Sequence, residues 1–310
     1  YGLVGSEMCI RDSATTAARV ADRLGLIADN VAVCSTGLIG ELLPMPTLLA
    51  GCESAAAALS DDGGSAAATA IMTTDTVAKT ATYDGEGWSV GGMAKGAGML
   101  APGLATMLVV LTTDALVEPG DLAGVLRGAT SKTFDRVDSD GCMSTNDTVL
   151  ALASGASGLR VPVPDLEVAV TEVCADLALQ LVRDAEGAAH EVRIDVIRAA
   201  SEADGLSVGR AVARSNLVKC AIFGNDPNWG RILAAVGTTD AAFDGDDLDV
   251  TINGIPVCRG SALGADRDLV DLSAREAHIL IDLKVGTEAV TVWTNDLTHD
   301  YVHENSAYST

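Results

Sequence analysis

A shortage of bulky side chains is the feature that most constrains this fold. Aromatic residues make up 3% of the 310 residues although apolar residues make up 48%, and 32 residues are glycine. A core of this composition must be filled by Ala, Val, Leu and Ile, whose small side chains let neighbouring backbones approach closely. The length suits one large domain or two modest ones.

Charge and cysteine content exclude several classes of protein. The formal net charge of -23 would repel phosphate backbones, so we expect no nucleic-acid partner. The seven cysteines form no C-x-x-C pair and, with the four histidines, show no metal-site spacing, which favours free thiols in a reducing cytoplasm. The apolar stretches are too short to span a membrane. We therefore expect a cytoplasmic protein without a bound metal.

Hydrophobic periodicity predicts helices and strands in alternating order. A helix is expected from Asp165 to about Asp184, because its apolar residues recur every three to four positions. Strands are expected over 31–34 and 217–223, and several short ones after residue 247. This order argues for α/β or α+β layers rather than a bundle or an all-β barrel. A second, smaller domain is expected to begin near residue 190.

The first thirteen residues differ from the rest of the chain. They lack the basic end and apolar centre of a signal peptide. The run from Met8 to Ser13 looks like a translated adapter sequence. We therefore predict that residues 1–13 are not native, that a helix starts at Ala14, and that the protein begins there in mid-domain.

A glycine-dense stretch, residues 91–103, leads into an apolar run over 105–111 that reads as a buried strand. From composition alone, Thr106 is an ordinary residue of that strand. Neither a phosphate-binding loop nor a nucleophile elbow is present, and Asp138–Gly141 lacks the spacing of a calcium loop.

Seven ordered motifs carry a resemblance. They are Cys34–Gly40, Met72–Thr76, Lys95–Leu108, Asp140–Thr148, Asp184–Gly187, Gly224–Arg231 and Glu304–Thr310. From Ala14 to Thr310 the chain resembles the ornithine acetyltransferase (glutamate N-acetyltransferase) family of arginine biosynthesis. The opening segment of that family's first subunit has no counterpart here.

The resemblance implies a self-cleaving DmpA/ornithine-acetyltransferase-like sandwich of sheets flanked by helices, with a smaller C-terminal α/β domain. Cleavage between Ala105 and Thr106 would divide it into the remainder of an α chain (14–105) and a β chain. The β chain would comprise a part that completes the sandwich (106–190) and a C-terminal domain (191–310). Paired α and β chains would assemble as an α2β2 heterotetramer.

The implied chemistry is acetyl transfer from N2-acetylornithine to glutamate through an acetyl-Thr106 intermediate. The freed Thr106 supplies both a nucleophilic hydroxyl and an α-amine whose pKa, near 8, suits a general base. No cofactor is implied, although acetyl-CoA is a possible co-substrate.

By resemblance, Thr36 and Gly37 form the oxyanion hole through a hydroxyl and a backbone N–H. Substrate-binding residues are then Thr73, Lys95, Thr106, Glu186, Asn305 and Thr310. Each has a simpler interpretation: a strand-ending turn at 36–37, a helix cap at 73, a solvent lysine at 95, an exposed helix end at 186, and a frayed tail at 305–310.

Two other functions remain open at this point. A related self-cleaving aminopeptidase or amidase would pass its acyl group to water instead of an amino acid. An inactive truncated fragment would not process itself at all.

Overall fold

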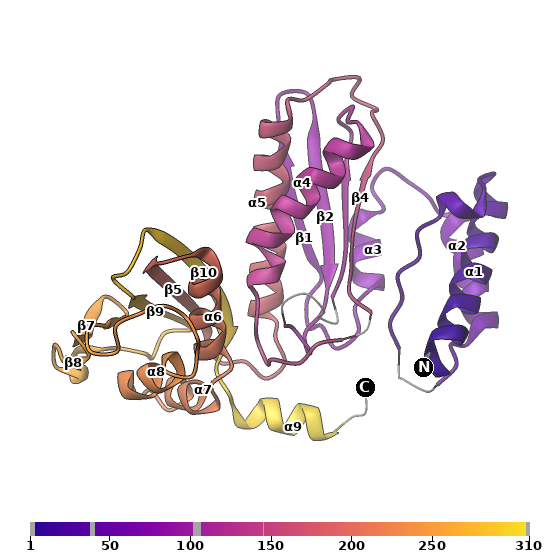
Figure 1. Ribbon diagram of the computed structural model, residues 1–310. Helices are drawn as coiled ribbons and strands as arrows, with labels where there is room; N and C mark the ends of the chain where they lie inside the picture. The colour runs from indigo at the N-terminus through magenta and orange to yellow at the C-terminus, as the bar shows by residue number, and fades with distance from the viewer. Residues whose placement is uncertain (1–3, 38–40, 102–106, 145, 308–310) are drawn as a thin grey trace.

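The computed structural model describes residues 4–37, 41–101, 107–144 and 146–307, with side chains described from Ile10 onward. Two β-sheets, each flanked by helices, form a mixed α/β structure, as the sequence predicted (Figure 1). Within these residues no helix combines the length and apolar character needed to cross a bilayer.

The N-terminal sheet unit (residues 64–190) has a four-stranded sheet in the order β1-β2-β3-β4. Its strands are β1 (Lys79–Asp84), β2 (Ser89–Lys95), β3 (Leu108–Thr113) and β4 (Thr148–Ala153). Its helices are α3 (Gly64–Ala70), α4 (Pro119–Lys132) and α5 (Val163–Arg183). β1, β2 and β3 are antiparallel neighbours, whereas β3 and β4 run parallel.

Helix α5 shows how small residues shape this unit. Its apolar face is buried, as the periodicity predicted, and it lies against β1 and β2. A Cβ added to Gly92 of β2 would come within 2.9 Å of Leu177 and 3.1 Å of Val173, both on α5. Glycine at this position therefore permits the close approach of helix and strand.

The C-terminal sheet unit (residues 191–295) has six strands in the order β10-β5-β9-β6-β7-β8. Its strands are β5 (Glu191–Ala199), β6 (Asp249–Ile252), β7 (Ile255–Arg259), β8 (Ala262–Leu263), β9 (Glu276–Asp282) and β10 (Glu288–Asn295). Its helices are α6 (Glu202–Ala213), α7 (Asn216–Phe223) and α8 (Trp229–Val236). Buried aliphatic side chains from strands and helices form one continuous core.

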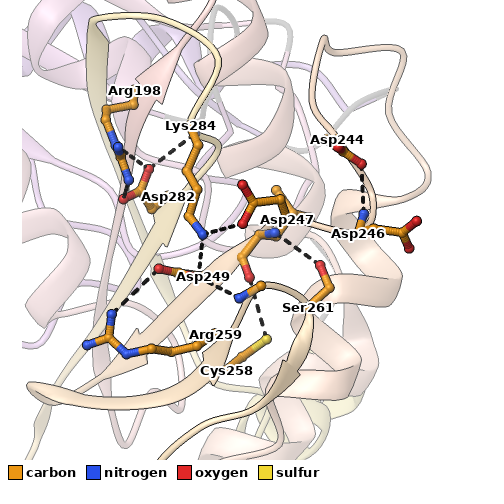
Figure 2. Close-up of polar contacts among 12 residues, drawn as sticks. Arg198, Asp244, Asp246, Asp247, Asp249, Cys258, Arg259, Ser261, Asp282 and Lys284 are labelled. Atoms are coloured by element: carbon orange, nitrogen blue, oxygen red, sulfur yellow. Dashed lines mark hydrogen bonds and ion pairs between the residues drawn. The ribbon is translucent and has the colours of Figure 1, made fainter.

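Charged side chains of this unit gather at its surface. Lys284 donates to Asp247 and Asp249 at 2.6 and 2.7 Å, and Arg198 donates to Asp282 (Figure 2). These groups lie at one end of the neighbouring strands β5, β9 and β6 and are partly exposed, so water screens their attraction.

Three of the described helices stand outside the sheet units. The hairpin of α1 (Val4–Leu24) and α2 (Met45–Ala57) stands beside the β4 side of the first sheet (Figure 1). After β10 the chain returns in α9 (His299–Ala307), which runs beneath the N-terminal sheet unit (Figure 1).

Three sequence expectations for local structure are wrong. Residues 31–34 form no strand, because the structure gives them no pairing neighbour. Residues 217–223 belong to helix α7, where the Ser215 side chain caps the helix by accepting from the Val218 amide and burial recurs at helical spacing. The first helix begins at Val4 and not at Ala14.

Candidate active site

The connection between β2 and β3 is unusually long for neighbouring antiparallel strands. Residues 96–107 join them, although hairpin loops commonly have two to five residues. The predicted cleavage site, Ala105 and Thr106, belongs to this connection and lies outside the described residues. Thr310, at the end of the chain, also lies outside the described residues. The structure does place Met107, the neighbour of Thr106.

Lys95, the last residue of β2, is buried with a 1% exposed fraction, so the solvent-lysine interpretation is wrong. Burial lowers the pKa of its ammonium group, and the negative charges of Asp75, Asp147 and Glu186 oppose that shift. Ionisable groups whose pKa is perturbed by burial and by nearby charges are common at functional sites.

Glu186 follows helix α5 and is also buried, with an 8% exposed fraction, which excludes an exposed helix end. Its backbone N–H donates to the Ala97 carbonyl at 2.9 Å, and its carboxylate accepts from Asn305 at 3.1 Å. A Cβ on Gly98 would lie 2.5 Å from this carboxylate. Glu186 is thus clamped between the 96–107 connection and α9.

Asn305 belongs to helix α9 and not to a frayed tail. The turn before this helix is fixed by Thr298, whose hydroxyl donates to the Gly187 carbonyl at 2.6 Å. Gly187 has a φ of +61°, and its added Cβ would lie 2.2 Å from the Tyr301 amide nitrogen. This close approach holds α9 beside Glu186.

Thr73 is exposed and lies beyond the end of α3, so it is not a cap of that helix. Its backbone N–H donates to Asp75 at 3.0 Å, and the same carboxylate accepts from the Gly96 amide at 2.7 Å. Asp75 therefore connects the segment of Thr73 directly to the end of β2.

Thr36 and Gly37 lie in an irregular segment, with no strand before them. The preceding Ser35 carbonyl accepts from the Asn146 side chain at 2.7 Å. Asn146 adjoins Asp147, whose carboxylate accepts from the Met107 amide at 3.2 Å. The predicted oxyanion-hole residues are thus tethered to the loop that holds the neighbour of Thr106.

Asp147 was not among the residues singled out from the sequence. Its second carboxylate oxygen is buried and has no hydrogen-bond partner within the described part of the chain. Burial raises the pKa of Asp147 to about 6, although the Met107 amide and the charge of Lys95 oppose the shift. It also lines a cavity of about 240 Å³ together with Met107 and Arg127.

A second cavity, of about 110 Å³, is lined by Glu186 together with Asp140, Lys219 and Tyr301. Asp140 accepts from the Met99 amide at 2.8 Å, where Met99 has a φ of +54°. Burial raises the pKa of Asp140 and lowers that of Lys219 to about 8.

The missed residues had one signal in the sequence. Asp75, Asp140 and Asp147 all occur inside the ordered motifs, but nothing in the motifs states which segments they contact. Among the described side chains, no group of three or more His, Cys, Asp or Glu residues is arranged to hold a metal ion.

Comparison with known proteins finds similar sequences and a similar solved structure. Arginine biosynthesis bifunctional protein ArgJ of Streptomyces coelicolor is 61% identical over 299 residues, covering 96% of this chain and 78% of the relative. The ArgJ of Thermobifida fusca is 58% identical over 300 residues, covering 97% and 78%.

A crystal structure of arginine biosynthesis bifunctional protein ArgJ from Bacillus halodurans matches with a TM-score of 0.61 and 34% identity. The match covers 65% of this chain and 98% of the solved chain. The ArgJ family model matches residues 4–310. By its sequence and its fold, this chain belongs to the ArgJ family.

Proposed function

We propose that this chain is the ornithine acetyltransferase and glutamate N-acetyltransferase of a cytoplasmic arginine biosynthesis pathway, with Thr106 as its nucleophile. The observation that carries the proposal is the convergence of Lys95, Asp147 and Glu186 on the 96–107 connection of an ArgJ-family chain. Asp147 accepts from the amide of Met107, the residue that follows Thr106 in the sequence.

Processing comes first in this proposal. The Thr106 hydroxyl attacks the Ala105 carbonyl carbon, the peptide bond breaks to give an ester and a free amine, and water then hydrolyses the ester. The products are a carboxylate at Ala105 and an N-terminal Thr106.

Cleavage need not separate the two pieces. β2 would end one chain and β3 would begin the other, yet they are antiparallel neighbours paired from Val90–Thr113 to Lys95–Leu108. Helix α5 of the second piece also lies against β1 and β2 of the first. The α–β pair is therefore expected to stay one folded unit, and we propose that two such pairs form the α2β2 assembly.

Turnover then has two halves. The Thr106 α-amine takes the hydroxyl proton as Oγ attacks the acetyl carbonyl of N2-acetylornithine, and ornithine leaves with the proton. The glutamate amine next attacks the acetyl-Thr106 ester, releasing N-acetylglutamate and restoring the hydroxyl. The Thr36 hydroxyl and Gly37 N–H would stabilise the oxyanion in both halves. Acetyl-CoA is a possible alternative acetyl donor.

The charged residues suit amino-acid substrates. The Lys95 ammonium would bind a substrate carboxylate, and the Glu186 carboxylate a substrate ammonium, with Thr73, Asn305 and Thr310 completing the contacts. Two opposite charges in one buried site orient a zwitterionic substrate better than either alone.

Electrophoresis and intact-mass analysis of the purified chain test processing. We expect pieces ending at Ala105 and beginning at Thr106, no cleavage in Thr106→Ala, and normal cleavage in Thr112→Ala, an exposed threonine of β3. Mass spectrometry of N-acetylglutamate formed from N2-acetylornithine and glutamate tests transfer. An uncleaved wild-type chain would contradict processing, and acetate release exceeding acetyl transfer would favour an amidase.

A further inference from the structure

A buried ion triad adjoins the site and is used by no step above. Lys79 donates to Asp75 at 2.6 Å and to Asp184 at 2.5 Å. The three side chains are at most 6% exposed. Such a group is costly to bury unless each charge is compensated, so its composition needs a reason.

The triad connects the segments that carry the predicted substrate-binding residues. Asp75 accepts from the amides of Thr73 and of Gly96, the residue after Lys95. Asp184 accepts from the Thr76 amide at 2.9 Å and lies two residues before Glu186. Strand β2, helix α5 and the 72–76 segment therefore meet at one point.

The triad also carries an excess charge. One lysine balances one aspartate, so two aspartates around Lys79 leave one negative charge over. The nearby cation that can balance it is Lys95, on which Asp75 exerts the strongest attraction, followed by Asp147 and Glu186, while Lys79 exerts a repulsion. A purely structural tie between β1 and α5 would need only one of the two acids.

We propose that Asp75 is a positioning residue of the acetyl-transfer site, which keeps the Lys95 ammonium in place and fixes the Thr73 and Gly96 backbones around the substrate. Its part in catalysis rests on the proposed function, whereas its hold on Lys95 does not. Asp184 anchors the triad to α5 and acts on Lys95 only through Lys79.

Direct titration of Lys95 tests this inference without any activity. The chain has five lysines, so ¹³Cε-lysine NMR gives a readable spectrum, in which Lys95→Arg assigns the Lys95 signal. Asp75→Asn keeps the size and an acceptor oxygen but removes the charge. We expect it to lower the Lys95 titration midpoint by about one pH unit or more. Asp184→Asn is the matched control, with a shift less than half as large.

A variant expected to shift the Lys95 midpoint in the opposite direction controls for misfolding. Lys79→Gln removes the cation that repels Lys95, so the Lys95 midpoint should rise. An unchanged Lys95 midpoint in both Asp75→Asn and Lys79→Gln, or an equal shift in Asp184→Asn, would overturn the proposal.

The pH profile of kcat/KM supplies the catalytic readout. In Asp75→Asn the alkaline limb should move to lower pH by the same amount as the Lys95 midpoint. A loss of thermal stability with an unmoved profile would reduce Asp75 to a structural residue. If the wild-type chain transfers no acetyl group, the proposed function fails, while the NMR titration still decides whether Asp75 holds Lys95.

Discussion

In the N-terminal sheet unit, Lys79 and Lys95 are almost fully buried, whereas the C-terminal sheet unit fills its centre with aliphatic side chains. The two buried charged residues described in the latter, Glu191 and Lys219, both contact the first unit, through Arg183 and Ser139. The remaining ion pairs of the second unit, among them those drawn in Figure 2, include partly exposed side chains.

Burying charged side chains and burying aliphatic side chains have opposite effects on stability. Burying a charge costs stability, so a unit that does so repeatedly at one end of its sheet is organised around binding. Burying only aliphatic groups gains stability and provides a rigid support. Both units have an apolar core, and the first unit in addition accepts the cost of burying charged groups.

The largest contrast is expected from two lysine substitutions. Lys95→Met removes the buried cation and should lower kcat/KM for acetyl transfer by about 10²-fold or more. Lys284→Met removes a cation from the partly exposed cluster of the second unit and should leave kcat/KM unchanged. Steady-state kinetics on both purified variants measures the contrast. Comparable activities would show that the buried charge has no part in transfer.

Two glycines should separate function from stability. In Gly98→Ala the new Cβ would meet the movable Glu186 carboxylate at 2.5 Å, so the protein should fold normally but lose about tenfold or more in kcat/KM. In Gly209→Ala of α6 the Cβ would meet Val292 at 2.8 Å inside the core. That variant should keep its activity and lose about 1–2 kcal/mol, the overpacking cost less the gain in helix propensity. Kinetics and urea unfolding on both variants measure the two effects, and a reversed pattern would contradict the division of roles.

The smallest effect concerns the pH dependence of stability at Asp147. Because its folded-state pKa is raised to about 6, the folded protein keeps a proton that the unfolded chain loses near pH 4. The stability gained from that proton is present at low pH and is lost as the pH rises through about 6. The free energy of unfolding of Asp147→Asn, relative to that of wild type, should therefore rise between about pH 4 and pH 6. Above about pH 6 this difference should stay constant. Urea unfolding of both proteins across this pH range tests the prediction. Parallel plots of unfolding free energy against pH would exclude a raised pKa of Asp147.

The sequence predicted the regular parts of both units well. The apolar stripe of α5 is a strong helical signal because helical spacing brings the stripe to one face, and that face is buried. For residues 217–223 the prediction of a strand was wrong, because a short apolar run fits a strand or a buried helix equally well. Residues 31–34 failed because a strand exists only where another strand pairs with it.

The sequence named candidate site residues but could not give the contacts between them. The motifs named Lys95, Glu186 and Asn305. They did not indicate the hydrogen bond between Glu186, which follows α5, and Asn305 of α9. Asp75 and Asp147 act on backbone amides of Gly96 and Met107, and such contacts leave no periodic trace in a sequence. These contacts depend on where Gly96 and Met107, the two ends of the connection, lie in the folded chain.

The return of α9 to the first unit has a consequence for the order of events during synthesis. Residues 64–190 can pair their four strands and cover them with α4 and α5 before the second unit has left the ribosome. The contact between Asn305 and Glu186 joins positions 119 residues apart and follows a turn of the chain at Thr298. It cannot form on a nascent chain until residues 191–304 have been synthesised.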